Sequence, residues 1–253
     1  MASMDGNVAV VTGAARGVGF GIAQEMAAAG ACVVVTDLNQ DDVDAAAVQI
    51  GSGAEGLTAD VTQLESMEAM YAEVIRRHGR LDSVIANAGV GDGAPLGSIT
   101  EKRFDFITGV NLKGVLFTVQ AALPRLKPGG TAVIIGSTAS IQAQKGMSVY
   151  GATKAGLRMF VRTSIQDVKG SGIRINMLSP GAIDTPSLRK AFADASGPEN
   201  VDANVTRMGE GSPLGRLGDP REIGKAAVFL ASDQSSFITG VELFVDGGVA
   251  QSG

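Results

Sequence analysis

The feature that most constrains this chain is a turn with three glycines that follows directly on a short apolar run. Residues 8–11 read VAVV, and the segment from Thr12 to Gly19 reads TGAARGVG before a helical pattern of apolar residues begins. A buried strand that enters a helix through such a turn presents backbone N–H groups and a helix N-terminus, where a phosphate group can bind. The stretch therefore predicts a nucleotide-binding loop.

Each of the three glycines has an expected task. Gly13 permits the tight turn, Gly17 lets the backbone approach a pyrophosphate, and Gly19 lets the helix pack closely on the strand. The spacing is G-x3-G-x-G rather than the commoner G-x-G-x-x-G, so the turn alone leaves a plain glycine-rich connection as an alternative. Asp37 favours the nucleotide, because it ends the next strand pattern 18 residues after Gly19, where an acidic side chain binds ribose hydroxyls.

Strand and helix patterns alternate along all 253 residues, without a linker or a charge run. This alternation predicts an α/β protein with a Rossmann-type, doubly wound, mostly parallel seven-stranded sheet and helices on both faces. We expect one domain over residues 1–253. The expected strands lie near 7–12, 32–37, 55–59, 82–87, 131–136, 173–179 and 241–246, and the expected helices near 17–29, 40–50, 63–78, 101–127, 148–169 and 220–231.

Charge and composition exclude several classes of partner. The net charge of −5 argues against a nucleic-acid or anionic-membrane partner, since both need a basic surface. No apolar run reaches the roughly 18 residues of a membrane span and the N-terminus lacks a signal-peptide pattern, so a cytoplasmic protein is expected. Cys32 is expected as a small buried strand residue, and His78 as a helix-end residue followed by Gly79. With one Cys and one His, we expect no zinc site of the usual type.

Polar residues follow the third and fourth strand patterns, at the edge of the sheet where ligands bind in such folds. Asp60-Val61 and Asn87-Ala88-Gly89 are candidates to contact an adenine edge and to brace neighbouring strands. For Asp60 the sequence leaves a second possibility open, the N-cap of the helix that starts at Gln63.

The segment 101–127 is apolar on nearly every face, which predicts a helix that contacts another subunit as well as the core. Asn111 lies in its middle. A polar amide there needs a reason, either a local kink with bound water or a functional link.

Ser137 follows the fifth predicted strand. Tyr150 and Lys154 lie on one face of the next predicted helix, because they are four residues apart. An unperturbed tyrosine has a pKa near 10, and a neighbouring ammonium group, together with the positive charge of a nicotinamide, would lower that pKa toward 7. A Tyr/Lys pair on a solvated face is the alternative for the spacing alone. The preceding serine and the glycine-rich turn favour the catalytic interpretation.

With these motifs, and with Pro180-Gly181 and Asp246-Gly247-Gly248, the chain resembles the short-chain dehydrogenase/reductase family over its whole length. The resemblance implies that Tyr150 donates or accepts a proton and that Ser137 orients the substrate oxygen. It also implies that Lys154 binds the ribose and tunes Tyr150, and that Asn111 holds a water in a proton relay. A homotetramer is implied too, with the 101–127 and 148–169 helices and the last strand at interfaces.

The segment after the sixth strand is expected to close over the nicotinamide. The resemblance puts Ile183 and Thr185 beside the carboxamide, and residues 187–212 have the length of an active-site lid. Gln142, Gln144 and Met147 are candidates to line the pocket, although loop polarity explains the glutamines equally well. The expected cofactor-binding residues are Gly13, Arg16, Gly17, Val18, Gly19, Asp37, Asp60, Val61, Asn87, Ala88, Gly89, Tyr150, Lys154, Pro180, Gly181, Ile183 and Thr185.

The sequence thus predicts an oxidoreductase that interconverts a secondary alcohol and a ketone with NAD(H). An NADPH-dependent ketoreductase of the 3-oxoacyl-(acyl-carrier-protein) kind and a non-catalytic dinucleotide sensor are the two alternatives. Asp37 favours NAD over NADP because its carboxylate repels a 2′-phosphate, whereas Arg16 could bind that phosphate. The expected substrate is a small alcohol or ketone, and no metal is expected in the site.

Overall fold

A single parallel sheet of seven strands forms the centre of the protein, in a computed structural model that describes residues 3–252. The strand order is β3-β2-β1-β4-β5-β6-β7, and every neighbouring pair is parallel. The predicted doubly wound fold is therefore confirmed. The strands are β1 Val8–Thr12, β2 Cys32–Asp37, β3 Glu55–Thr58, β4 Leu81–Ala86, β5 Leu126–Ile135, β6 Arg174–Pro180 and β7 Glu242–Val245.

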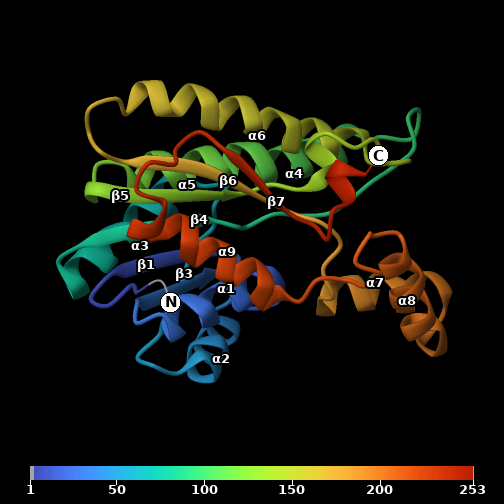
Figure 1. The fold of residues 1–253 in the computed structure, drawn as a ribbon, viewed down its shortest axis with the longest axis horizontal. Helices are drawn as coiled ribbons and strands as arrows, with labels where there is room; N and C mark the ends of the chain where they lie inside the picture. The colour runs from blue at the N-terminus through green and yellow to red at the C-terminus, as the bar shows by residue number, and fades with distance from the viewer. Residues whose placement is uncertain (1–2, 253) are drawn as a thin grey trace.

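Helices cover both faces of this sheet (Figure 1). They are α1 Gly17–Ala28, α2 Gln40–Ile50, α3 Leu64–His78, α4 Glu101–Thr108, α5 Val115–Ala122, α6 Ser148–Asp167, α7 Pro186–Ser196, α8 Val201–Glu210 and α9 Pro220–Ala231. None of the helices in residues 3–252 combines the length and the apolar character that a membrane crossing requires.

The strands are apolar throughout because each face of the sheet is buried under helices. In β1, Ala9 and Val11 belong to the core beneath α1, α2 and α9, whereas Val8 and Val10 belong to the core beneath α3, α5 and α6. Alternate residues of a strand point to opposite faces, so one short run contributes to both cores. This double burial fixes the register of β1, whose carboxyl end carries the glycine turn.

The helix predicted over residues 101–127 is interrupted and shorter than expected. It consists of α4, a π-helical turn at Gly109–Gly114 and α5, which ends at Ala122. Pro124 ends the helix, because proline has no N–H to donate and disfavours helical backbone in the residue before it. The following strand β5 consequently begins at Leu126 rather than near 131, and its register shifts before Thr131.

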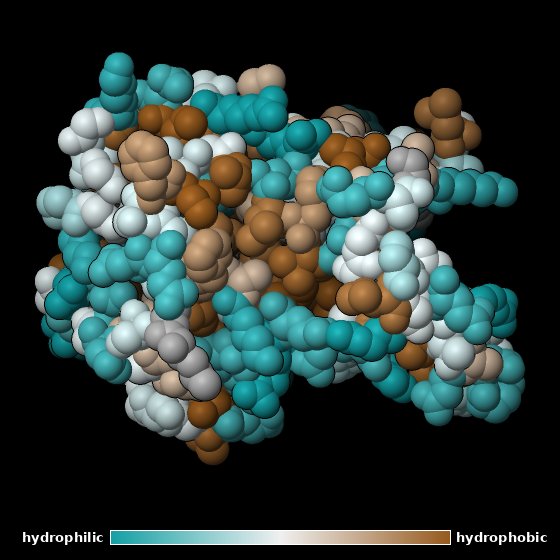
Figure 2. Space-filling model, viewed as in Figure 1, coloured by the Kyte–Doolittle hydropathy of each residue, from teal (hydrophilic) through white to brown (hydrophobic). Residues whose placement is uncertain are grey.

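The segment expected as a lid is helical. Residues 187–212 form most of α7 and all of α8, which stand out from the body of the protein in Figure 1. No residue of α7 is buried, and only Gly209 is buried in α8. Figure 2 shows the molecule notched on the side where these helices protrude, with hydrophobic side chains gathered toward the middle of the view.

Candidate active site

The glycine turn joins β1 to α1 with the backbone that its sequence predicts. Gly13 and Gly17 have φ values of 63° and 62°, in the left-handed region that favours glycine. A Cβ at Gly13 would lie 2.7 Å from the Cα of Ala88, and a Cβ at Gly19 would lie 2.5 Å from the Asn87 side chain. Side chains at these two positions would therefore push the turn away from the end of β4.

The start of α1 fits an anionic group such as a phosphate. Arg16 occupies the N-cap position but makes no capping hydrogen bond, and the first turn contains no acidic residue. The unpaired N–H groups of this turn and the helix dipole both favour an anion. A Cβ at Gly17 would meet nothing closer than Thr185, at 3.6 Å, so the backbone is open on that side. Val18, in the same turn, packs against the core beneath α1.

Asn87 holds the glycine turn against the end of β4. Its side-chain amide donates to the carbonyl oxygens of Thr12 and Gly13, at 2.8 and 2.9 Å. The Thr12 hydroxyl in turn accepts from the backbone N–H groups of Asn87 and Ala88, at 3.1 and 3.2 Å. The sequence analysis did not assign this bracing role to Thr12. A hydroxyl at the end of an apolar strand could have indicated it. The predicted bracing of neighbouring strands by Asn87 and Ala88 is present.

Asp37 ends β2 beside the glycine turn. Its carboxylate accepts from the N–H of Leu38 at 2.9 Å and of Ala15 at 3.4 Å, so it also orients the turn. Arg16 is exposed and makes no ion pair within residues 3–252. Asp37 and Arg16, the two residues expected to decide between NAD and NADP, thus lie at the same end of the turn.

Asp60 stabilises its own turn. Oδ1 of its carboxylate accepts from the N–H and the hydroxyl of Thr62, at 2.9 and 2.7 Å. The alternative role as helix N-cap is wrong, because α3 starts at Leu64 with Gln63 as its N-cap. Val61 is buried, and a Cβ at Gly114 would approach it to 2.8 Å, so Val61 packs against the π-helical turn.

Asn111 lies in the π-helical turn, fully buried. Its Oδ1 accepts from the N–H of Val90 at 2.8 Å, and its Nδ2 donates to the carbonyl oxygen of Val90 at 2.9 Å. The amide therefore pairs with the backbone that follows β4, and a π-turn is the local distortion that allows it. Asn111 and Lys154 converge, since a Cβ at Gly89 would lie 3.3 Å from Asn111 Oδ1 and 3.7 Å from Lys154 Nζ.

Lys154 and Tyr150 project from α6 toward the carboxyl ends of β4 and β5. Lys154 is 4% exposed, and its Nζ donates to the carbonyl oxygen of Ile135 at 2.9 Å. The ammonium lies 5.7 Å from the centre of the Tyr150 ring. Ser137 caps the short 3-10 helix Thr138–Ser140, with its hydroxyl accepting from the N–H of Ala139. The alternative of a Tyr/Lys pair on a solvated face is excluded by this burial.

The electrostatics of the pair differ from the sequence expectation. Burial raises the pKa of Tyr150 above its usual value, and a hydrogen bond with Ser137 acts in the opposite direction. Burial also lowers the pKa of Lys154 to about 8, because no carboxylate compensates its charge. The expected lowering of the Tyr150 pKa included the positive charge of a bound nicotinamide and stays a prediction for the protein with its cofactor, whereas burial dominates in the chain alone.

The loop after β6 lies over the glycine turn. The N–H of Gly181 donates to Val245, and a Cβ at Gly181 would lie 2.8 Å from Asp246, which fixes the path after Pro180. Ile183 pairs with Gly218 in an isolated bridge. Thr185 caps α7 and faces Gly17, so the two segments that were predicted to enclose a dinucleotide are adjacent.

A cavity of about 220 Å³ lies between this loop, the lid and the C-terminal segment. Its lining includes Gln144, Ile183, Met208, Leu217 and Asp246. Ser137, Tyr150 and Lys154 are not among its lining residues, so this cavity lies beside the candidate catalytic residues, and of the three predicted pocket residues Gln144 reaches it. Gln142 donates to the carbonyl oxygen of Val249, and Met147 is the N-cap of α6. Met208 of α8 lies in the segment 187–212 that was expected as a lid, although the sequence did not single out this residue.

Comparison with known proteins agrees with this geometry. A family profile described as "Enoyl-(Acyl carrier protein) reductase" matches residues 13–250. The chain is 38% identical over 250 residues to "Oxidoreductase asL5" of Sarocladium schorii, covering 98% of this chain and 97% of the relative. It is 32% identical to the "3-oxoacyl-[acyl-carrier-protein] reductase FabG" of Thermotoga maritima, covering 97% and 98%.

The ligand-free aldohexose dehydrogenase AldT of Thermoplasma acidophilum has a closely similar structure. The TM-score is 0.89 at 27% identity, and the match covers 98% of this chain and 95% of that one. The relatives are thus oxidoreductases matched over nearly their full length. The chain belongs to the short-chain dehydrogenase/reductase family of oxidoreductases.

Proposed function

We propose that this protein interconverts a secondary alcohol and a ketone by hydride transfer with NAD(H). The observation that carries the proposal is the buried Lys154, whose ammonium lies beneath the Tyr150 ring and bonds the end of β5. A buried cation without a carboxylate partner is costly, so its retention needs a functional reason. Binding a ribose and raising the acidity of a neighbouring phenol would supply one.

In this proposal Tyr150 is the general acid or base. When the substrate is an alcohol, the phenolate accepts the hydroxyl proton, and when it is a ketone, the phenol donates one to the oxygen. The bound nicotinamide supplies the hydride or accepts it. Ser137, whose hydroxyl acts to lower the pKa of Tyr150, orients the substrate oxygen. Because burial raises the pKa of Tyr150, ionisation depends on positive charge from Lys154 and from the oxidised nicotinamide.

Asn111 is proposed to hold a water that connects Lys154 with solvent. Its two amide atoms both bind Val90, so Asn111 is held rigidly beside Gly89 and Lys154. A proton released by the phenol would leave through Lys154 and this water. The relay is supported by the proximity of the two side chains.

The dinucleotide would bind along the carboxyl edge of the sheet. The first turn of α1 would take the pyrophosphate, and Asp37 the hydroxyls of the adenosine ribose. The proposed contacts with the dinucleotide come from the glycine turn and from the segments that follow the strands. They are Gly13, Arg16, Gly17, Val18, Gly19, Asp60, Val61, Asn87, Ala88, Gly89, Tyr150, Lys154, Pro180, Gly181, Ile183 and Thr185. Asp60 is proposed to contact adenine with the oxygen that does not bind Thr62.

An NADPH-dependent 3-oxoacyl-(acyl-carrier-protein) reductase is the second candidate. It is favoured by the similarity to a FabG protein and by the exposed Arg16 beside the turn. Asp37 argues against it, since a 2′-phosphate about 4 Å away would be repelled by about 4 kcal/mol at an effective dielectric near 20. A non-catalytic dinucleotide sensor is disfavoured, because Asn111, Ser137, Tyr150 and Lys154 are all present.

We also propose that the whole chain acts as one catalytic domain with α7 and α8 as its lid. Its partner is a small alcohol or ketone rather than nucleic acid or a membrane, its location is cytoplasmic, and its assembly is a homotetramer. Exposed apolar side chains on α4, α5 and α6 support the assembly, among them Phe104, Leu116 and Met159.

The test is a panel of secondary alcohols and ketones that includes 3-oxoacyl thioesters, followed by nicotinamide absorbance with each cofactor. The proposal expects turnover of at least one alcohol with NAD and its loss in Tyr150→Phe. Turnover only of 3-oxoacyl thioesters with NADPH would establish the second candidate. Tight dinucleotide binding with no turnover across the panel would favour the sensor.

A further inference from the structure

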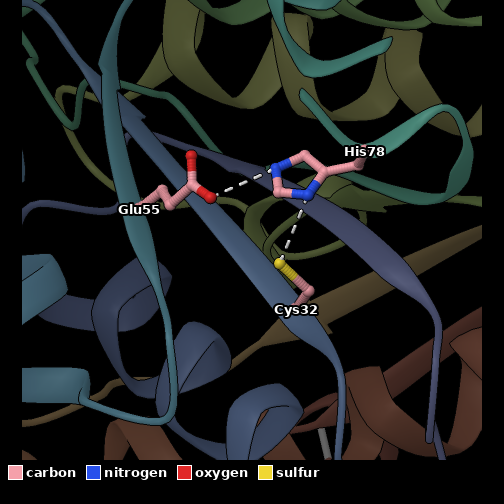
Figure 3. Close-up of side chains that lie close together, drawn as sticks. All are labelled: Cys32, Glu55 and His78. Atoms are coloured by element: carbon pink, nitrogen blue, oxygen red, sulfur yellow. Dashed lines mark hydrogen bonds and ion pairs between the residues drawn. The ribbon is translucent and has the colours of Figure 1, made fainter. Parts of the chain in front are cut away.

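Three residues with metal-binding side chains meet at the end of the sheet opposite the candidate active site. Cys32 is the first residue of β2, Glu55 the first residue of β3, and His78 the last residue of α3. They are far apart in sequence, and the parallel pairing of β2 with β3 brings them together. Figure 3 shows the imidazole between the thiol and the carboxylate.

The three side chains lie within reach of one metal ion, and their closest contacts use both nitrogens of the imidazole. Cys32 Sγ lies 3.8 Å from His78 Nδ1, and Glu55 Oε1 lies 3.4 Å from His78 Nε2. Two ligands of a tetrahedral zinc ion are separated by about 3.4–3.6 Å, given the usual zinc–ligand bond lengths. One ligand atom from each residue lies within 4.8 Å of the other two. Because an imidazole gives one nitrogen to one ion, the His78 ring would turn to bring that nitrogen toward both the thiol and the carboxylate.

One of these candidate ligand atoms lacks a hydrogen-bond partner. Nε2 of His78 is buried and makes no hydrogen bond within residues 3–252, because its contact with Glu55 has ion-pair distance but not hydrogen-bond geometry. A buried, unpaired ring nitrogen is costly. A cation between the imidazole and the carboxylate would satisfy it.

The surrounding charges favour a cation over a reactive thiol. The Glu55 carboxylate places negative charge beside the Cys32 thiol. Arg77 binds Oε2 of Glu55 at 2.7 Å and also pairs with Glu73, which orients the carboxylate and leaves Oε1 toward the histidine. A divalent ion would displace the thiol proton and be neutralised by thiolate and carboxylate.

We propose that Cys32, Glu55 and His78 bind one divalent transition-metal ion of the zinc class, with a fourth position taken by water. Zinc accepts sulfur, nitrogen and oxygen ligands together, and one imidazole nitrogen suffices. The site would link β2, the edge strand β3 and the end of α3. It would therefore stabilise the edge of the sheet and take no part in hydride transfer. This differs from the sequence expectation that no metal is bound.

The first experiment titrates the fully reduced protein with Co²⁺. Cys32 is the only cysteine, so any sulfur-to-cobalt charge-transfer band must come from this site. We expect such a band at one equivalent, with visible bands of the intensity typical of four-coordinate cobalt, and its displacement by Zn²⁺. Absence of the sulfur band from folded protein at saturating Co²⁺ would overturn the proposal.

The second experiment measures Zn²⁺ affinity by competition with a chromophoric chelator. Cys32→Ser, Glu55→Gln and His78→Gln should each weaken binding at least about tenfold, whereas Glu68→Gln on the exposed face of α3 should not. Zn²⁺ should also raise the melting temperature of the unmodified protein and not that of His78→Gln. Equal affinity in all four variants would place the ion elsewhere and refute the site. None of these readouts depends on enzyme activity, so they stand apart from the proposed function.

Discussion

The Glu242 carboxylate accepts a hydrogen bond from the Ser140 hydroxyl at 2.6 Å, across 102 positions of sequence. The same oxygen accepts from Ser179 at 2.7 Å, and the other oxygen pairs with Arg158. Glu242 thus joins β7 and β6 to α6 and to the 3-10 helix that begins after Ser137. This one buried carboxylate holds the segment on which the serine of the candidate site lies.

Replacing Glu242 should therefore affect both stability and turnover. Glu242→Ala leaves two hydroxyls and a guanidinium unpaired, so we expect the free energy of unfolding to fall by about 2–4 kcal/mol. Glu242→Gln retains an acceptor for the serines and should lose less. Urea denaturation measures the stability, and kcat of each variant reports the position of Ser137. Identical stability for the Ala and Gln variants would show that the serine contacts contribute nothing.

Tyr150→Phe should lower kcat by at least about 100-fold, the usual contribution of a positioned acid or base. The ring still packs, so the dissociation constant for the dinucleotide should change only a few fold. Steady-state kinetics and fluorescence titration measure the two quantities. A variant that keeps a tenth of the activity would remove Tyr150 from the acid–base role.

Lys154→Met should stabilise the protein below pH 8 while harming both turnover and dinucleotide binding. The folded protein lowers the pKa of Lys154 to about 8 from 10.5, so the folded state binds fewer protons than the unfolded chain between these values. Burying the ammonium therefore lowers the free energy of unfolding by about 3 kcal/mol. This cost is complete below pH 8 and vanishes above pH 10.5. The lost bond to Ile135 offsets part of it, roughly 1 kcal/mol.

Denaturation of both proteins from pH 7 to pH 10 measures this difference. The advantage of the methionine variant should shrink as pH rises through that range. An advantage that stayed constant with pH would mean that Lys154 is not deprotonated in the folded protein at pH 10. An effect on kcat alone, with dinucleotide affinity preserved, would contradict the double role of Lys154.

Asp37 should give a preference for NAD of at least about tenfold in kcat/KM, because its repulsion of a 2′-phosphate exceeds what one exposed arginine recovers. Asp37→Ala should shrink or invert the preference, and adding Arg16→Ala should then weaken NADP. The Asp37 carboxylate also bonds Ala15 and Leu38, so Asp37→Asn is the matched control that keeps an acceptor. Equal efficiency with NADP in the unmodified protein contradicts this assignment.

Light scattering should give about four times the chain mass of 25.7 kDa. Phe104 and Leu116 are 49% and 39% exposed on α4 and α5, and their burial between subunits would remove apolar surface from water. Changing both to glutamate should lower the mass. Val48→Glu, at an exposed apolar position of α2, should leave it unchanged. A mass of one chain for the unmodified protein at micromolar concentration would refute the assembly.

Local patterns in the sequence were sufficient to predict the strands, most helices and the glycine turn. Buried strands in a parallel sheet are apolar on both faces, and Gly13 and Gly17 are required by backbone angles that other residues avoid. The spacing of Tyr150 and Lys154 likewise puts both on one helix face whatever surrounds them. These features depend on residues that are close together in the sequence, so they can be predicted without knowledge of the fold.

Only the tertiary structure decided what depends on the order of the strands. The Asn111 amide lies in a π-helical turn because it pairs with the backbone of Val90. The sign of the Tyr150 pKa shift follows from burial, which no spacing reveals. Cys32 and His78 appear in the sequence as a core residue and a helix end. They meet Glu55 because β2 and β3 are paired, and pairing between distant segments is set by the packing of the whole sheet rather than by any local pattern.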